Sequence, residues 1–332
     1  MNSNHRMCWR SAAGRLLFVA AAGIAALTAS PAAQAQDYPN RAVKIIVPFP
    51  AGGTADAMPR AVADFLSRKW GQPVVIENRS GAGGNVGAEA AYKSEPDGYT
   101  LLSAPPPPLV VNHNLYPKLG FDPLKFEPIA VMGLVPNALL TNPGFPPKSV
   151  AEVIAFAIAN PGKIISATQG NGTTSHLTSE MFQMMAGIKV THVPYRGAAP
   201  ALSDLVGGTA NIMFDNLGVS LAQVQGKKIR LLGVATPKRM PTLPDVPTIA
   251  ETLPGFESAA WFAVVAPPGT SKKIVEKINA DINEALRDPA VVKRMGAMSA
   301  QIVGGSTQET AKFFRSEVDR WHKVIKAANI KL

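Results

Sequence analysis

One local design occurs twice in this sequence, in Val47-Pro-Phe-Pro-Ala-Gly-Gly-Thr-Ala-Asp56 and in Ser166-Ala-Thr-Gln-Gly-Asn-Gly-Thr-Thr-Ser-His176. In each stretch, a strand-like run ends in a glycine turn and a helical pattern follows at once. Glycine allows a close approach of the backbone to a ligand, and the first amides of a helix have no acceptor within it. The helix dipole favours an anion there. Either stretch alone is equally typical of a structural turn, but the pair favours capture of a carboxylate.

Around these two stretches, short apolar runs alternate with amphipathic segments from Asp37 onward. The strand-like runs are Val43–Val47, Val74–Glu77, Thr100–Ser103, Ile129–Met132, Ala138–Thr141, Lys163–Ala167, Val190–Val193, Asn211–Phe214, Leu231–Ala235 and Trp261–Ala266. The helical stretches are Met58–Trp70, Val86–Ser94, Val150–Asn160, Ser175–Ala186, Pro200–Val206, Ser271–Leu286 and Thr310–Ala327. This alternation predicts an α/β protein with open parallel sheets covered by helices. Ligands bind beyond the carboxyl ends of such strands, so a cleft between two lobes is the expected site.

Proline and glycine gather at two places that divide the chain, Asn142-Pro-Gly-Phe-Pro-Pro147 and Leu253-Pro-Gly-Phe256. They bracket a middle block of ordinary domain size. We therefore expect one lobe from residues 36–136 plus 259–332 and a second lobe from residues 137–258. The chain would then cross between the lobes near Val135–Ala138 and Phe256–Ala260.

The N-terminus has the pattern of a secretory signal peptide. Arg6, Arg10 and Arg15 precede the apolar run Leu16–Leu27, and Ala33-Gln-Ala35 is a small-x-small cleavage sequence. The apolar run is too short to span a bilayer, which takes about 20 residues. We expect residues 1–35 to be removed after Ala35 and the product to be periplasmic. The cut would also remove Cys8, the only cysteine, which excludes disulfides and thiol chemistry from the mature chain.

The composition and the remaining motifs argue against other classes of protein. The net charge is +10, but Lys and Arg are spread along the chain without the basic stripe of a nucleic-acid binder. The run Gly218-Val-Ser-Leu-Ala222 lacks the second glycine of a serine-hydrolase elbow, and Gly81-Ala-Gly-Gly-Asn-Val-Gly87 has its last glycine misplaced for a dinucleotide site. The histidines show no metal spacing, and no cofactor is predicted. His176 is either a catalytic base or, more in keeping with a helix start, a brace of its loop.

Eight ordered motifs carry a family resemblance that runs from Tyr38 to Leu332. They are Tyr38-Pro39, Ile46–Asp56, Val75-Ile-Glu-Asn-Arg-Ser-Gly-Ala-Gly-Gly84, Pro96-Asp-Gly-Tyr-Thr-Leu101, Gly170–His176, His192-Val-Pro-Tyr-Arg-Gly197, Pro244-Asp-Val-Pro-Thr248 and Trp261-Phe-Ala-Val-Val-Ala-Pro267. In these motifs the chain resembles the extracytoplasmic substrate-binding proteins of tripartite tricarboxylate transporters, the Bug family.

The resemblance implies a type II periplasmic binding fold, with two open α/β lobes and a ligand cleft between them. It also implies a monomeric, non-enzymatic solute-binding protein without a cofactor. Such a protein captures a small mono- or dicarboxylate and delivers it to the membrane subunits of a transporter. The alternatives are an exported hydrolase or other enzyme acting on a carboxylate, and a ligand receptor that serves a sensor.

The ligand-binding positions that the resemblance implies lie in four loops. They are Phe49, Ala51, Gly52, Gly53, Thr54, Asp56, Ala104, Pro105, Pro106, Gly172, Thr173, Thr174, His176, Asp215 and Asn216. Asp56 could equally be an ordinary acid in the first turn of a helix. The run Pro105–Pro108 departs from the family, whose members more often have small polar residues there. Four prolines predict a polyproline II segment, which is either an apolar wall suited to aromatic or long-chain carboxylates or a spacer turned away from the cleft.

Overall fold

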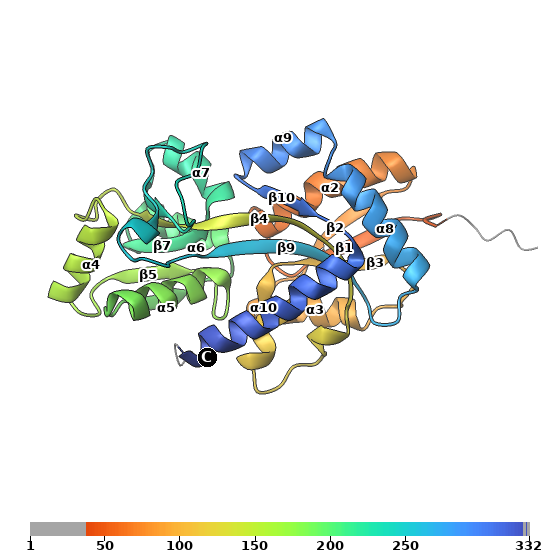
Figure 1. Ribbon diagram of the computed structural model, residues 1–332, viewed down its shortest axis with the longest axis horizontal. Coiled ribbons are helices and arrows are strands. Elements are labelled where there is room, and N and C mark those ends of the chain that lie inside the picture. The colour runs from red at the N-terminus through yellow and green to blue at the C-terminus, as the bar shows by residue number, and fades with distance from the viewer. Residues whose placement is uncertain (1–37, 328–329, 331–332) are drawn as a thin grey trace, which may run out of the picture. The chain divides into compact units, whose positions relative to one another are not determined.

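The apolar runs of the sequence form one mixed sheet, and the amphipathic stretches form the helices around it (Figure 1). The computed structural model describes residues 38–327 and 330. Its strands are β1 (Val43–Val47), β2 (Val74–Asn78), β3 (Thr100–Ala104), β4 (Glu127–Thr141), β5 (Ile165–Thr168), β6 (Thr191–Pro194), β7 (Ile212–Asn216), β8 (Arg230–Val234), β9 (Ala259–Ala266) and β10 (Gln301–Gly304). Its helices are α2 (Thr54–Trp70), α3 (Asn85–Tyr92), α4 (Val150–Ala159), α5 (Thr174–Ala186), α6 (Ala198–Gly207), α7 (Leu217–Gln225), α8 (Lys272–Ala285), α9 (Pro289–Ala297) and α10 (Thr307–Ala327). The expected signal peptide, residues 1–35, and Cys8 lie outside the described residues.

Two groups of parallel strands are joined by two strands that run through the middle of the sheet. The order is β2-β1-β3-β9-β4-β7-β5-β6, with β8 and β10 also paired to β4. β1 is parallel to β2 and β3, and β5 is parallel to β6 and β7. β4 and β9 lie side by side and antiparallel between these groups (Figure 1). The two glycine loops therefore follow β1 and β5, one strand from each parallel group.

Strand β4 is longer than the sequence predicts. We expected separate strands at Ile129–Met132 and Ala138–Thr141, because Gly133 and Pro136 are typical interruptions. The structure has one strand of 15 residues, whose first part pairs with β9 and β10 and whose last part pairs with β7 and β8. The pairing continues past Pro136 because the next amide, that of Asn137, donates to the carbonyl of Ser258 at 3.0 Å.

Each parallel group has its own apolar core. In the first, Trp261 stacks on Phe314 with ring centroids 5.1 Å apart, and its indole nitrogen donates to the buried Glu317 carboxylate at 2.7 Å. In the second, the rings of Phe182, Phe214 and Phe256 pack at centroid distances of 5.4–6.1 Å. The expected α/β class is confirmed by this arrangement of a covered sheet with two cores.

The proline run after β3 is helical, which corrects the expected polyproline II segment. Pro106 has φ −49° and ψ −38°, and a π-helical turn, η2, spans Pro107–Val111. A proline has the φ of a first helical turn and needs no acceptor there, so the run starts this turn instead of extending. The elements β10, α7 and α9 were not predicted from the sequence; β10 has four residues, and α7 and α9 have nine each.

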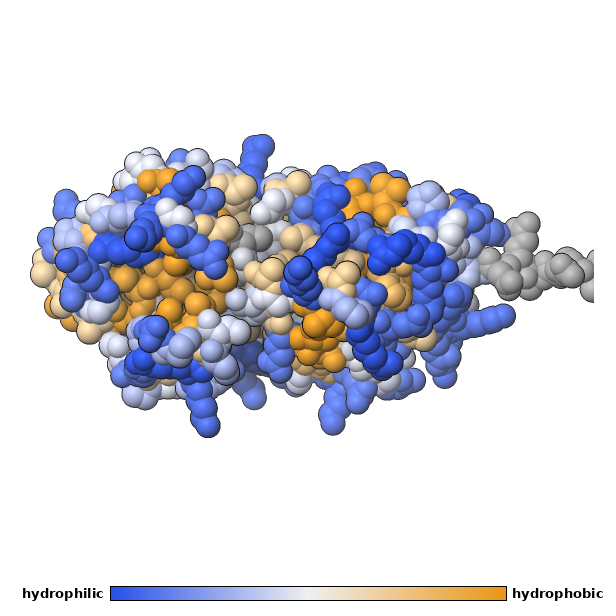
Figure 2. Space-filling view, turned by 90° about the horizontal axis from the view of Figure 1, so that it is seen from above, coloured by the Kyte–Doolittle hydropathy of each residue, from blue (hydrophilic) through white to orange (hydrophobic). Residues whose placement is uncertain are grey.

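Large apolar side chains are exposed singly at several places, among them Leu124 and Ile158. Figure 2 shows hydrophilic side chains dispersed between apolar areas on the face that it views. Single exposed apolar residues are ordinary on protein surfaces. Over the described residues, none of the helices combines the length and the apolar character that crossing a membrane requires.

A glycine in α3 tests how tightly this helix packs on the strand before the first glycine loop. A β-carbon at Gly87 would lie 2.7 Å from the Arg79 carbonyl oxygen and 2.8 Å from the Pro48 α-carbon, both backbone atoms. We expect Gly87→Ala to lower the free energy of unfolding by about 1–3 kcal/mol through overpacking. The matched control is Gly296→Ala in α9, where nothing lies within 4 Å and the gain of helix propensity should stabilise by about 0.5–1 kcal/mol. Urea denaturation followed by circular dichroism measures both, and equal effects of the two variants would contradict the packing.

Candidate functional site

The first turns of α2 and α5 meet at one cavity, although they follow strands of different parallel groups. Gly53 is the N-cap of α2 and Thr173 is the N-cap of α5. The cavity is lined by Phe49, Pro50, Gly53, Thr54, Ala55, Pro105, Pro107, Gln169, Thr173, Thr174, Ala198, Asn216 and Phe262. Two positive helix ends that face one small space favour a negative group between them.

The hydrogen bonds of the two helix starts determine which donors are left for a ligand. In α2 the amides of Asp56 and Ala57 donate to the Gly53 carbonyl, which leaves the amides of Thr54 and Ala55 without an acceptor among the described residues. The Thr54 hydroxyl is also buried without a partner there. In α5 the amide of Thr174 likewise has no acceptor among the described residues. The free donors therefore lie on the helices, one and two residues beyond the N-cap of α2 and one residue beyond the N-cap of α5.

Asp56 holds the first glycine loop together. One carboxylate oxygen accepts from the Gly52 amide at 3.2 Å, and the other accepts from Arg60 Nε at 3.0 Å and from Asn78 Nδ2 at 2.9 Å. Asn78 Nδ2 also donates to the carbonyl of Phe49. Burial raises the pKa of Asp56, but the hydrogen bonds from Arg60, Asn78 and Gly52 outweigh it and hold the pKa below its usual range. Both oxygens are thus engaged in bracing the turn.

The second glycine loop is also held by bonds within itself. The Thr173 hydroxyl donates to the Gly170 carbonyl at 2.6 Å and accepts from the His176 amide at 3.4 Å. The amide of Gly172 donates to His176 Nδ1 at 3.2 Å. Gly172 has φ +75°, which glycine adopts without strain. The loop is therefore pre-formed, and its own amide at Gly172 is occupied.

A second, larger cavity adjoins the first and shares Phe49, Pro50 and Gln169 with it. The first has a volume of about 20 Å³ and the second about 520 Å³. The other residues around the larger cavity are Pro48, Ser80, Gly81, Ala82, Gly83, Gly84, Tyr116, Gly170, Asn171, Pro194, Tyr195 and Arg196. Among the residues that the structure describes, Arg196 is the only charged one that lines either cavity. A ligand thus meets donors at the narrow end and one cation at the wide end.

Asp215 lies behind the narrow cavity. It is fully buried at the end of β7, where Gln169 Nε2 donates to one carboxylate oxygen and the other has no partner among the described residues. Burial raises the pKa of Asp215 to about 7, although hydrogen bonds from the Asn216 amide and the Gln169 side chain oppose this rise. The carboxyl group therefore holds its proton well into the neutral range.

The structure places about half of the expected ligand residues on the narrow cavity. Those that line it are Phe49, Gly53, Thr54, Pro105, Thr173, Thr174 and Asn216. Those that do not line it are Ala51, Gly52, Asp56, Ala104, Pro106, Gly172, His176 and Asp215. In this second set, Gly52, Asp56, Gly172 and His176 make the internal bonds of the two loops, and Asp215 contacts the lining residue Gln169.

Several lining residues were not expected from the sequence. They are Gln169, Ala198 and Phe262, whereas Pro50 and Ala55 lie within the expected loop Phe49–Asp56 and Pro107 lies within the proline run Pro105–Pro108. The amide of Ala55, the second residue of α2, has no intrahelical acceptor. Ala198 and Phe262 carry apolar side chains with no chemical signal in the sequence. They reach the cavity only because β6 and β9 are placed there by the sheet.

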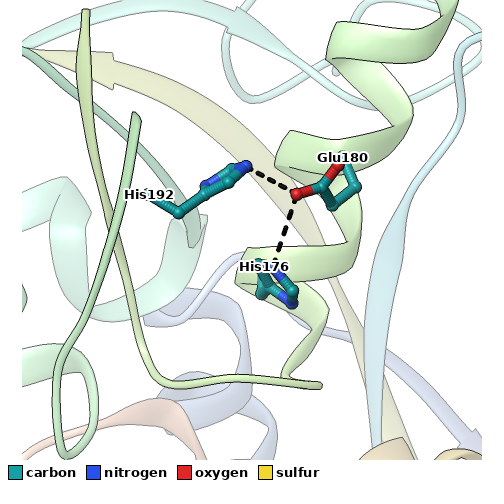
Figure 3. Close-up of side chains that lie close together, drawn as sticks. All are labelled: His176, Glu180 and His192. Atoms are coloured by element: carbon teal, nitrogen blue, oxygen red, sulfur yellow. Dashed lines mark ion pairs between the residues drawn. The ribbon is translucent and has the colours of Figure 1, made fainter. Parts of the chain in front are cut away.

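Three side chains near the second glycine loop could hold a metal ion. His176 and Glu180 lie one turn apart on α5, and His192 lies on β6 (Figure 3). One donor atom from each lies within 4.8 Å of the others. The sequence shows no metal spacing, because His192 is 16 residues from His176. The pairing of β6 with β5, not the local sequence, brings His192 to α5.

Comparison with known proteins gives one consistent family. The model of the tripartite tricarboxylate transporter family receptor matches residues 58–330. The protein BugT of Bordetella pertussis is 39% identical over 319 residues, covering 95% of this chain and 96% of its own length. A protein encoded between tcbD and tcbE in Pseudomonas sp. strain P51 is 38% identical and covers 94% of each chain.

Solved structures of similar proteins give the same result. An R. palustris protein solved with adipate has a TM-score of 0.87 and 39% identity, covering 89% of this chain and 99% of its own. The periplasmic binding protein BugD has a TM-score of 0.84 and 33% identity, with the same coverage. MatC from Rhodopseudomonas palustris, solved with malate, has a TM-score of 0.83 and 32% identity, covering 87% of this chain and all of its own. The expected two-lobe periplasmic binding fold is confirmed by this similarity.

The buried carboxyl group of Asp215 should give the unfolding free energy a specific pH dependence. Below about pH 4 the group is protonated in both the folded and the unfolded chain, so it contributes nothing. Between about pH 4 and pH 7 the unfolded chain releases this proton while the folded chain keeps it, so stability falls as pH rises. Asp215→Asn should therefore gain stability relative to the native chain over this interval and keep a constant advantage above pH 7.

Urea unfolding at half-unit steps from pH 4 to pH 8 measures the difference between the two proteins. The exposed Asp64, which pairs with Arg294 at the surface, provides the control Asp64→Asn, because a surface ion pair contributes little to stability. A flat difference for Asp215→Asn would show that the carboxyl group ionises normally.

Proposed function

Because this chain belongs to the tripartite tricarboxylate transporter receptor family, we propose that it captures a small organic carboxylate in the periplasm and delivers it to the membrane subunits of such a transporter. The relatives solved with adipate and malate support a carboxylate as the ligand. The observation that carries the proposal is the meeting of two helix starts at one cavity, with donors free on both.

The ligand's carboxylate group binds in the narrow cavity. The donors to it are the amides of Thr54, Ala55 and Thr174 and the hydroxyl of Thr54. A volume of about 20 Å³ holds one or two waters and therefore suits a single carboxylate head, not a whole diacid. The rest of the ligand extends past Phe49 into the larger cavity. Expected site residues away from the narrow cavity, such as Asp56 and His176, support binding by holding the loops.

Capture and release occur through movement of two lobes. The proposed lobes are residues 36–136 plus 259–332 and residues 137–258, with β4 and β9 as the crossings between them. Close approaches between loops of the two proposed lobes support a closing motion: a β-carbon at Gly197 would lie 2.9 Å from Pro50 Cδ, and one at Gly83 would lie 3.1 Å from the Asn171 carbonyl. We expect these loops to separate when the ligand enters or leaves.

The proposed function also includes removal of the signal peptide and the oligomeric state of the mature protein. Cleavage after Ala35 is supported by the basic, apolar and small-residue order of residues 1–35. The proposal also includes action as a monomer. No catalytic step belongs to the proposal, and a bound carboxylate should be recovered unchanged after release.

Replacement of Thr54 tests the donor set directly. Thr54→Val keeps the shape of the side chain and removes a hydroxyl group that has no partner among the described residues. A hydrogen bond to a charged group contributes about 1.5–3 kcal/mol, so adipate should bind roughly ten- to a hundredfold more weakly. Isothermal titration calorimetry measures the dissociation constant, and Thr54→Ser should recover most of the affinity. An unchanged constant in Thr54→Val would remove this hydroxyl from the site, and failure of the native chain to bind any carboxylate would reject the proposed function.

The apolar wall formed by Phe49, Pro105, Pro107 and Phe262 tests the ligand class. Prolines lack an amide donor and phenylalanine rings have no polar atom, so these side chains and proline nitrogens offer no donor to extra hydroxyl or carboxylate groups on a ligand. We expect adipate-like and benzoate-like acids to bind more tightly than malate or citrate. A thermal-shift panel ranks them, since ligand at a hundred times its dissociation constant stabilises by about 2.7 kcal/mol. Equal or greater shifts with the hydroxylated acids would contradict this choice of ligand.

A further inference from the structure

We propose that His176, Glu180 and His192 bind a divalent transition metal such as Zn²⁺, and that this metal competes with the ligand-binding form of the second glycine loop. A carboxylate oxygen of Glu180 lies between the two imidazole rings (Figure 3). The competition rests on the proposed carboxylate binding. The metal site does not, because it is argued from these side chains and their neighbours alone.

The three donor atoms lie close to the positions that a metal ion requires. His176 and Glu180 are four residues apart on α5, so their side chains share one face of this helix. Glu180 Oε1 lies 3.5 Å from His176 Nε2 and 2.8 Å from His192 Nε2. Ligands at about 2.0–2.1 Å from a tetrahedral zinc ion are roughly 3.3–3.5 Å from one another. The first distance fits this value, and the second needs an opening of about 0.5 Å.

His192 has two polar neighbours that make conflicting demands on one ring nitrogen. The Gln183 side-chain oxygen accepts from the Val190 amide at 2.7 Å, which turns the Gln183 nitrogen toward the ring. This nitrogen, a donor, lies 2.7 Å from His192 Nε2, and the Glu180 carboxylate, an acceptor, lies 2.8 Å from the same atom. One nitrogen cannot accept from Gln183 and donate to Glu180 at once. When its lone pair faces Glu180, a cation between the two atoms replaces a repulsion by two bonds.

The charge of Glu180 also favours a cation at this place. Its side chain is only 26% exposed, and among the described residues no lysine or arginine pairs with it. Buried charges in proteins are paired or coordinate a metal ion. The other carboxylate oxygen accepts from Gln183 Nε2 at 3.2 Å, which orients the group. His192 lies on β6, the last strand in the order of the sheet, so an ion can reach the site from that edge.

Two imidazole nitrogens and one carboxylate oxygen determine the class of metal. Imidazole suits zinc, copper, iron and nickel, whereas Ca²⁺ and Mg²⁺ prefer sites made of oxygen atoms alone. Three protein ligands leave the fourth position of a tetrahedral ion for water. We therefore expect Zn²⁺ to bind here and Mg²⁺ not to compete with it.

The competition with the loop follows from the other nitrogen of His176. The Gly172 amide donates to Nδ1 at 3.2 Å, so Nδ1 has no proton in this arrangement. A neutral imidazole has one N–H group, and a metal ion on Nε2 requires that group to be on Nδ1. Two donors would then face each other, so the Gly172 amide must turn away. Metal binding and the hydrogen bond to Gly172 therefore exclude each other.

A turn of the Gly172 peptide affects both cavities. Asn171, on one side of it, lines the larger cavity, and Thr173, on the other side, lines the narrow one. Space for the movement is limited, because a β-carbon at Gly172 would lie 3.1 Å from Leu115. Metal binding should thus displace lining residues and weaken carboxylate binding. By linkage, a bound carboxylate should weaken metal binding by the same factor.

Zinc binding can be measured without any carboxylate. The chain is purified without an affinity tag, stripped of metals with EDTA, dialysed and titrated with Zn²⁺ by calorimetry at neutral pH. His192→Asn and Glu180→Gln should each weaken zinc binding by about a hundredfold or more, since even a change to a group that only supports a ligand costs about ten- to a hundredfold. His322→Asn replaces an exposed histidine outside the cluster and should keep the native zinc affinity. His176 is left unchanged because its replacement would also remove the hydrogen bond to Gly172.

A spectrum of the native chain gives a readout that does not depend on the folding of a variant. X-ray absorption at the zinc edge should show two imidazole ligands in the native chain loaded with zinc. Failure of the metal-stripped native chain to bind Zn²⁺ more tightly than Mg²⁺, fewer than two imidazoles at the edge, or native zinc affinity in both variants would overturn the metal site.

Adipate titrations with and without saturating Zn²⁺ test the competition. We expect zinc to weaken adipate binding roughly five- to a hundredfold in the native chain and to have no effect in His192→Asn. An adipate affinity that zinc leaves unchanged in the native chain, or changes equally in His192→Asn, would overturn the competition. If zinc binds as expected but adipate binds neither with nor without it, the metal site stands and the proposed function fails.

Discussion

Asn137 makes the hydrogen bonds on which the geometry of the site depends. It is fully buried in β4, where its side-chain nitrogen donates to Thr178 Oγ1 at 3.0 Å and to Ser258 Oγ at 2.8 Å. Its side-chain oxygen accepts from Asn216 Nδ2 at 2.8 Å. One amide thus joins β4, the residue before β9, helix α5 and a lining residue of the cavity. A buried polar network that is fully satisfied specifies one arrangement, since any alternative leaves a donor or acceptor unpaired at a cost of about 1–3 kcal/mol. The start of α5 is held against both crossing strands for this reason.

In and after each glycine loop, some backbone amides are bonded within the protein and others are free to bind a ligand. The amides of Gly52 and Gly172 are bonded to Asp56 and His176, each four residues further on in the first turn of the following helix. In both loops a side chain of the helix thus ties back the turn that precedes it. The donors left over are the amides directly after the N-caps, those of Thr54 and Ala55 in α2 and of Thr174 in α5. This is the common reason why two unrelated loop sequences produce similar helix starts.

The sequence predicts the helix starts well and the orientation of single side chains poorly. Glycine, threonine and the change of periodicity locate Thr54, Thr173 and Thr174, because local backbone chemistry determines them. Asp215 and Asn216 show the limit: consecutive strand residues point to opposite faces, and only the tertiary structure decides that Asn216 lines the cavity while Asp215 lies behind Gln169. The β5–β6 pairing likewise brings His192 to α5, and Pro106 is helical because the chain turns directly after β3.

The distribution of charge around the cavities explains how a neutral site can prefer an anion. The narrow cavity is lined without any ionised side chain, and its donors are amides and a hydroxyl group whose dipoles are already oriented. Such donors stabilise a carboxylate without the cost of removing a cation from water. The nearest acid behind the cavity is Asp215, whose pKa of about 7 keeps a negative charge away from the ligand over much of the neutral range. A bound anion disfavours ionisation of Asp215 further, because like charges raise the pKa of a carboxyl group. The burial of Asp215 thus has two effects. It lowers the stability of the ligand-free protein, and it keeps the carboxyl group from repelling the bound anion.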